Sequence, residues 1–279
     1  MAAGVLRSWL DGRRANVLWL EYEAYARRVF ANTPSDWSRI ASRYANTMVQ
    51  ARKALPTDVL TFDLAAAGMA VLGDSEVGVA RVRAALAAPS GRAFIAEAID
   101  AVAHKLGATT DLVLKVATPL DLLMSADPDA SPNFDELDEI ATAITNLFRD
   151  LSDKPLAGVL LTRASTAVLS LDESDAYAPI LNAAQHYRWV TCMGLHSSVI
   201  GVSANHPADV DILLGPDMPL SAIRNLSPAI ARIGGGLDAA FWSNHESSFG
   251  HTAGDLLYGI IPDDLEPEQV LARMAVLTR

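Results

Sequence analysis

The sequence of 279 residues is 51% hydrophobic and carries a formal net charge of −11, with a pI of about 4.9. Such an acidic surface repels nucleic acid and anionic lipid, so we expect neither as a partner. No stretch approaches the ~20 uncharged apolar residues that cross a bilayer, and the first residues lack the order of a secretory signal. The single Cys192 excludes an internal disulfide, and we expect a cytoplasmic protein.

Runs of β-forming residues alternate with helical segments along the whole chain. The predicted strands are residues 16–21, 58–64, 112–117, 157–163, 190–196, 210–214, 230–234 and 256–261. The predicted helices are residues 5–14, 22–30, 35–55, 76–106 with a break near Pro89, 134–150, 172–187, 199–204, 220–226 and 266–277. Because this alternation requires parallel pairing with right-handed crossovers, we predict one α/β domain over residues 1–279, a (β/α)8 TIM barrel. An open doubly wound sheet is the alternative.

Polar residues at the carboxyl ends of the predicted strands are the candidate site residues, because barrel enzymes place their active sites there. These residues are Glu21, Asp63, Lys115, Arg163, His196, Asp217, Asp238 and Tyr258. As a carboxylate, Asp63 can stabilise developing positive charge or move a proton, whereas its alternative role is to cap the next helix. His196 can act as an acid or base near neutral pH, and the Tyr258 hydroxyl can donate to a substrate oxygen.

Two further stretches near the end of the chain have alternative interpretations. The glycines 234–236 either allow a tight turn or expose the backbone N–H groups of Gly235 and Gly236 to a substrate phosphate. His245, Glu246 and His251 lie between the last two predicted strands and invite a metal interpretation. Because a six-residue spacing fits no standard helical ligand pair, we favour a polar loop that covers the site. Phe241 and Trp242 are its candidate apolar anchor or part of the ordinary core.

Four stretches in order carry a resemblance to a known superfamily. They are DVLTFD at 58–63, VATPLDLL at 116–123, GGLD at 235–238 and LYGIIP at 257–262. They resemble motifs of the uroporphyrinogen decarboxylases, whose superfamily also holds cobalamin-independent methionine synthases and corrinoid or coenzyme M methyltransferases. The resemblance implies a TIM barrel and a catalytic role for Asp63, which matches the aspartate that ends the family's second-strand motif.

The chain departs from both branches of this superfamily at residues that carry their chemistry. Where the decarboxylases place arginines, this chain has Glu21 and Glu23, which repel a polycarboxylate, so we do not expect uroporphyrinogen as substrate. The family histidine near the end is matched by Tyr258. The methyltransferase branch binds zinc through His-x-Cys, whereas here Ser198 follows His196. Serine is a poor zinc ligand beside thiolate, so we expect neither a bound metal nor a cofactor.

The leading prediction is an enzyme that acts on a small organic molecule by metal-independent acid–base chemistry of the decarboxylase or lyase type. Asp63, His196 and Tyr258 are the predicted catalytic residues. The predicted substrate-binding residues are Glu21, Lys115, Arg163, Gly235, Gly236 and Asp238. The alternatives are a methyltransferase with an altered metal site and a non-catalytic ligand-binding barrel. Barrels of this kind often form homodimers, and no isolated apolar stripe in this sequence defines an interface.

Overall fold

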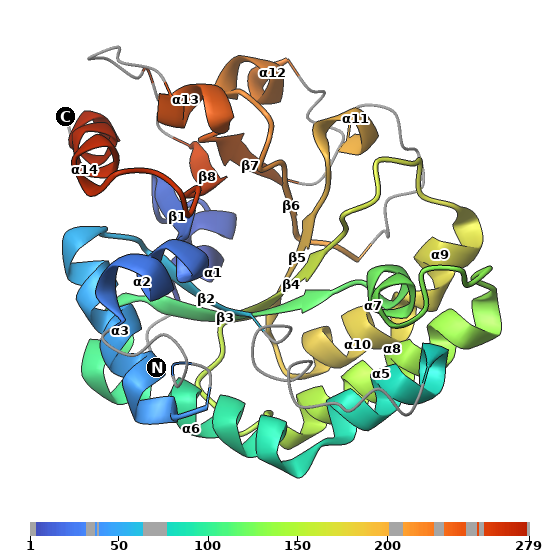
Figure 1. Ribbon diagram of the computed structural model, residues 1–279. Helices are drawn as coiled ribbons and strands as arrows, with labels where there is room; N and C mark the ends of the chain where they lie inside the picture. The colour runs from blue at the N-terminus through green and yellow to red at the C-terminus, as the bar shows by residue number, and fades with distance from the viewer. Residues whose placement is uncertain are drawn as a thin grey trace.

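The protein is described from a computed structural model (Figure 1). The structure describes residues 4–31, 37, 39–63, 77–200, 209–225, 232–243, 250 and 254–277. The loop residues His245, Glu246 and His251, for which a metal was considered, lie outside the described residues. No helix in the described ranges is long and apolar enough to span a membrane.

Eight parallel strands form a closed barrel in the order in which they occur along the chain, with β8 paired to β1. They are β1 (Val17–Glu21), β2 (Val59–Asp63), β3 (Asp111–Ala117), β4 (Gly158–Thr162), β5 (Val190–Gly194), β6 (Ile212–Leu214), β7 (Arg232–Gly236) and β8 (Leu256–Ile260). Closure confirms the predicted (β/α)8 barrel and excludes the open doubly wound sheet. Each predicted strand overlaps an observed one.

Helices surround the strands, as Figure 1 shows. The described helices are α1 (Val5–Leu10), α2 (Glu23–Phe30), α3 (Ala41–Ala54), α5 (Gly78–Ala87), α6 (Pro89–Leu106), α7 (Pro119–Ala126), α8 (Phe134–Asp150), α9 (Leu171–Ala176), α10 (Ala178–His186), α11 (Ser197–Ile200), α12 (Leu220–Arg224), α13 (Ala239–Ser243) and α14 (Pro267–Leu277). A 3-10 turn, Gly107–Thr109, precedes β3.

Helix boundaries follow local chemistry where that chemistry is strong. α8 begins at the predicted residue because the Asn133 side chain accepts from the Glu136 N–H and the Glu136 carboxylate accepts in return, a capping box. The long region 76–106 is interrupted at Pro89, as expected, because proline is favoured at the first position of a helix. Pro179 likewise lies in the first turn of α10, so the predicted helix 172–187 is two helices.

The side chains inside the barrel form a hydrophobic cluster of their own. Alternate strand residues such as Trp19, Val113 and Leu160 point inward, as the period of two in a strand requires. Helix α1 closes one end of this cluster with Leu6 and Trp9. The Leu6 N–H donates to the carboxylate of Asp111, the first residue of β3, at 2.7 Å. The closed end is therefore the amino-terminal end, and polar groups gather at the opposite one.

Candidate active site at the carboxyl ends of the strands

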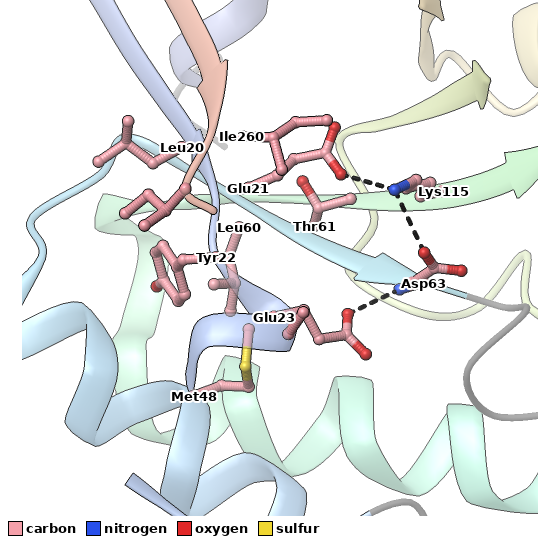
Figure 2. Close-up of a pocket in the computed structure, with 12 residues that line it drawn as sticks. Leu20, Glu21, Tyr22, Glu23, Met48, Leu60, Thr61, Asp63, Lys115 and Ile260 are labelled. Atoms are coloured by element: carbon pink, nitrogen blue, oxygen red, sulfur yellow. Dashed lines mark hydrogen bonds and ion pairs between the residues drawn. The ribbon is translucent and has the colours of Figure 1, made fainter. Parts of the chain in front are cut away.

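A cavity of about 110 Å³ lies at the carboxyl ends of β1 and β2 (Figure 2). Its lining residues are Leu20, Glu21, Tyr22, Glu23, Ala24, Met48, Leu60, Thr61, Asp63, Lys115, Ile260 and Ile261. β1 pairs with β8 along its whole length, but it pairs with β2 only where Trp19 lies opposite Val59. The two strands therefore leave room between their carboxyl ends, and the cavity occupies that position.

Lys115 lies between two carboxylates on this side of the barrel. Its Nζ is 2.8 Å from Glu21 Oε2 and 3.2 Å from Asp63 Oδ2 (Figure 2). Asp63 and Lys115 are Cα partners on neighbouring strands, so their side chains share the interior face. Burial opposes the charged form of Lys115, but Glu21 and Asp63 outweigh that effect and raise its pKa. Lys115 therefore stays an ammonium group.

Tyr258 fixes the other oxygen of Glu21 from inside the barrel. Its hydroxyl donates to Glu21 Oε1, and its ring packs edge-on against Trp19 with centroids 5.6 Å apart. Burial, followed by the charge of Glu21, raises the pKa of Tyr258, so its hydroxyl keeps its proton. The Trp19 indole in turn donates to Thr61 Oγ1 at 2.9 Å. Glu21 is therefore held at both oxygens, and Tyr258 is a positioning residue for it.

Glu23, in the first turn of α2, is the third acidic residue that lines the cavity, after Glu21 and Asp63. Its Oε2 accepts from the Tyr44 hydroxyl and from the Asp63 N–H, each at 3.1 Å. Its Oε1 is buried and has no hydrogen-bond partner in the described part of the chain. Burial, and then the charge of Asp63, raise the pKa of Glu23 to about 8. At neutral pH Glu23 is therefore largely a neutral acid, beside a charged lysine and two carboxylates.

Glu23 was not among the predicted site residues, although its charge was expected to repel a polycarboxylate. A strand-end rule selects the last polar residue of each strand, whereas Glu23 lies two residues beyond the end of β1, in the first turn of α2. The signal in the sequence is the pair Glu21 and Glu23, which a single tyrosine separates. Tyr44 gave no signal at all, because α3 brings it to the site only through tertiary packing.

His196 belongs to a second polar group, after β5. Its Nε2 is 3.0 Å from Asp217 Oδ2, and its Nδ1 is 2.8 Å from Ser198 Oγ. The Asp217 carboxylate also accepts from the Ser197 N–H at 2.9 Å and from the Ser197 hydroxyl at 2.6 Å. The structure thus joins two predicted residues, His196 and Asp217, but neither lines the cavity at Asp63. That Asp63 and His196 both act in catalysis stays a prediction.

Two predicted residues make structural contacts instead of lining the cavity. Arg163 is buried and forms two hydrogen bonds to Glu173, at 2.6 and 3.0 Å, while its Nη1 donates to two loop carbonyls at 2.7 Å. Asp238 accepts from the Phe241 N–H at 2.9 Å and so caps α13. The guanidinium of Arg163 is therefore directed to α9, and Asp238 takes the capping role that strand-end residues often have.

All three glycines lie within β7, whereas the predicted strand ended at Gly234 and left Gly235 and Gly236 beyond it. A Cβ at Gly234 would lie 2.2 Å from Leu256 Cδ2, and one at Gly235 would lie 2.7 Å from the Gly215 carbonyl. Gly236 has a φ of +94°, which L side chains rarely adopt, and its N–H donates to the Met218 carbonyl at 2.8 Å. These contacts explain why β7 carries glycines, because β6, β7 and β8 pack too closely there for larger side chains.

The described residues do not assemble a metal site. They contain no group of three histidine, cysteine, aspartate or glutamate side chains that could hold an ion. His196 and Asp217 lie together but supply only two of the three side chains that such a group needs. Cys192 points into the barrel interior, where burial raises the pKa of its thiol. The donor set around His196 therefore does not match the zinc thiolate site that the methyltransferase resemblance implies.

Comparisons with known proteins agree with the fold. No protein-family model matches the chain, and neither does any curated protein sequence. A methyltransferase from Methanosarcina mazei superimposes with a TM-score of 0.62 at 11% identity, over 97% of this chain and 96% of that one. The homocysteine methyltransferase MmuM from Escherichia coli, in its metallated form, superimposes with a TM-score of 0.52 at 12% identity, over 97% and 99%. At such identities the likeness shows a TIM barrel that is shared with methyltransferases.

Proposed function

We propose that the chain is a TIM-barrel enzyme that acts on a small organic molecule by proton transfer at the cavity between β1 and β2. The observation that carries this proposal is Glu23, a carboxyl with a pKa raised to about 8 beside the ion pairs of Lys115. A general acid or base works best when its pKa lies near the operating pH. Perturbed carboxyls in a cavity at strand ends are typical of active sites.

Glu23, Asp63 and Lys115 would each have a distinct role in a decarboxylase or lyase step. When a C–C bond of the substrate breaks, its electron pair remains on one carbon, and the Glu23 acid supplies a proton to that carbon. The Asp63 carboxylate stabilises positive charge that develops on the substrate. Lys115 stays charged and stabilises the negative charge that develops on the carbon that keeps the electron pair, before that carbon is protonated. Glu21 and Tyr258 hold Lys115 in place, so their role is positioning.

Methyl transfer to or from a small molecule is the second candidate, because both structural neighbours described above are methyltransferases. The carboxylates of the cavity favour a cationic methyl donor on electrostatic grounds. In this candidate the side chains of the cavity act without a metal, since the described residues do not form a site for one. The two candidates differ in the bond that breaks and therefore in the product to be measured.

One screen separates the two candidates. The purified chain is incubated with small organic acids and with methylated thiols and amines, and CO2 release and methyl transfer are both followed by mass spectrometry. We expect a product of C–C cleavage that the Glu23→Gln variant no longer forms. A methyl-transfer product instead would favour the second candidate. Turnover that is unchanged in Glu23→Gln and Asp63→Asn would place the chemistry elsewhere and overturn the proposal.

A further inference from the structure

A serine, a histidine and a carboxylate lie in contact beyond the carboxyl ends of β5 and β6. The Ser198 hydroxyl oxygen is 2.8 Å from His196 Nδ1, and His196 Nε2 is 3.0 Å from Asp217 Oδ2. In the closed barrel β5 and β6 lie across from β1 and β2, and none of the three residues lines the cavity there. A hydroxyl within hydrogen-bond reach of a base that a third group orients is the arrangement of an activated nucleophile.

The hydrogen bonds define which nitrogen of His196 carries the ring proton. A carboxylate only accepts, so Nε2 donates to Asp217. Nδ1 is then the acceptor of the ring, and the Ser198 N–H donates to it at 3.3 Å. The Ser198 hydroxyl is the closer donor to the same nitrogen, at 2.8 Å. Nδ1 is therefore placed to take the proton of that hydroxyl, which is the role of a general base.

Asp217 is itself held in position by the neighbouring serine. Its Oδ1 accepts from the Ser197 N–H at 2.9 Å, and its Oδ2 accepts from the Ser197 hydroxyl at 2.6 Å. Because the Ser197 hydroxyl is engaged with a carboxylate, Ser198 is the candidate nucleophile of the pair. Asp217 contacts the base and not the attacking oxygen, so it is a positioning residue for His196.

The candidate nucleophile is accessible from solvent. Ser198 is exposed, and the side chain of His196 is 44% exposed, so a reagent reaches both without a rearrangement of the chain. The Asp217 carboxylate and the net charge of −11 disfavour an anionic substrate. The substrate class is therefore uncharged.

The backbone around Ser198 restricts the substrate further. The N–H groups of residues 197–200 all donate already, two of them to Asp217 and His196 Nδ1 and two to the His196 carbonyl. None of these four N–H groups remains to stabilise an oxyanion. We therefore expect attack on carbonyl groups whose leaving group is a weak base, because such a group departs without strong stabilisation of the oxyanion.

We propose that Ser198 is the nucleophile of a second site, which hydrolyses small uncharged esters of phenols or other acidic alcohols. Ser198 Oγ attacks the carbonyl carbon while His196 Nδ1 takes the hydroxyl proton. The ester C–O bond breaks, and the proton passes from His196 to the departing oxygen. Water then attacks the acyl group on Ser198 and returns a proton through His196 to Ser198 Oγ, so that ester and water give acid and alcohol. This activity goes beyond the proposed function and uses none of the residues of the cavity between β1 and β2.

Labelling with an uncharged alkyl fluorophosphonate tests the nucleophile, because such reagents modify activated serine hydroxyls and leave ordinary ones unmodified. Ser198 Oγ forms a bond to phosphorus, fluoride leaves, and the hydroxyl proton passes through His196 to solvent. We expect peptide mass spectrometry to find the label on Ser198, and we expect the labelled protein to lose its hydrolysis of phenyl acetate. The absence of label from Ser198, or full hydrolysis by the labelled protein, would overturn the proposal.

Variants separate activation by the histidine from simple exposure. We expect Ser198→Ala to abolish phenyl acetate hydrolysis, and His196→Gln to slow labelling of Ser198 at least about a hundredfold, as loss of a general base does. Ser152→Ala is the matched control, because that exposed hydroxyl donates to the Arg149 carbonyl at 2.8 Å, and it should leave both measurements unchanged. Equal labelling rates in the wild type and His196→Gln would show that the hydroxyl is not activated and would refute the proposal.

The role of Asp217 has a spectroscopic signature that a purely structural role does not produce. The 15N shifts of the His196 ring report which nitrogen carries the proton. We expect Nε2–H in the wild type and Nδ1–H in Asp217→Asn, because the asparagine amide donates to Nε2, and we expect labelling of Ser198 in that variant to slow at least about tenfold. A wild-type ring protonated at Nδ1 would overturn the proposal, and that measurement decides even where a variant does not fold.

Discussion

Lys115 Nζ on β3 lies 2.8 Å from Glu21 Oε2 at the end of β1, so the ion pair reaches across β2. The same ammonium contacts Asp63 on β2 at 3.2 Å. One cation therefore ties together the carboxyl ends of three strands. Because Glu21 is only 7% exposed, its side chain has little contact with water, and the ion pair with Lys115 contributes more to stability than a surface pair would.

Replacement of Lys115 by methionine should destabilise the fold. The change shortens the unbranched side chain by one atom and leaves a buried carboxylate at Glu21 without its cation. Breaking a buried pair from one side costs about 3–5 kcal/mol, and the partial exposure of Lys115 puts the expected loss near the lower end. Urea unfolding measures it. In the double variant with Glu21→Gln, we expect recovery of part of the loss, and equal losses in both variants would contradict the assignment.

The stability of the protein should depend on pH through Glu23. Its folded-state pKa of about 8 is above the ordinary value of 4.5, so the folded state binds the proton more tightly than the unfolded state. The stabilisation is complete below about pH 4.5 and is lost as the pH rises to 8. Glu23→Gln mimics the neutral acid and removes this loss. We expect the unfolding free energy of the variant to gain on the wild type by about 1 kcal/mol per pH unit between pH 5 and 8.

The same measurement in Glu139→Gln provides the control, because that carboxylate is half exposed at the surface. Parallel pH curves for Glu23→Gln and the wild type would show that Glu23 titrates normally and that its burial has little effect.

Gly234 should tolerate no side chain. A Cβ there would lie 2.2 Å from Leu256 Cδ2 and 2.8 Å from Leu214 Cδ2, inside the packed barrel. Overpacking of this kind typically costs about 1–3 kcal/mol, so Gly234→Ala should lower the thermal midpoint. Gly250→Ala is the control, because a Cβ at Gly250 would meet no atom of the described residues within 4 Å. Equal midpoints for the two variants would refute the packing explanation of the β7 glycines.

Most of the architecture could be predicted, because its signals are local. Apolar runs and their alternation with helical segments define all eight strands, and the capping box at Asn133 fixes the start of α8. The helix α7 was not predicted, although Pro119 occupies its first turn and Thr118 caps it. The short α13 was missed because five residues show no helical periodicity.

The site could be predicted in part, for a physical reason. Position at a strand end was sufficient to select Glu21, Asp63, Lys115 and Tyr258, which the barrel brings together. The same rule also selected Arg163, because it cannot distinguish a side chain that points to the cavity from one that pairs with Glu173 on α9. Glu23 needed tertiary knowledge, since its raised pKa results from burial between α2, α3 and β2.

Asp63 provides the most direct test of the proposed chemistry. Asp63→Asn keeps the shape of the side chain and removes its charge, so it leaves packing nearly unchanged and removes the stabilisation of positive charge on the substrate. With a substrate from the screen, we expect turnover to fall at least about tenfold, which corresponds to ~1.4 kcal/mol of transition-state stabilisation. The neighbouring Lys115 remains paired with Glu21, and the fold should therefore persist, as urea unfolding can verify. Asp153→Asn, at a highly exposed carboxylate, is the matched control and should keep full turnover. If Asp63→Asn also keeps full turnover while remaining folded, Asp63 has no part in the reaction, and Glu23 with Lys115 must account for the chemistry.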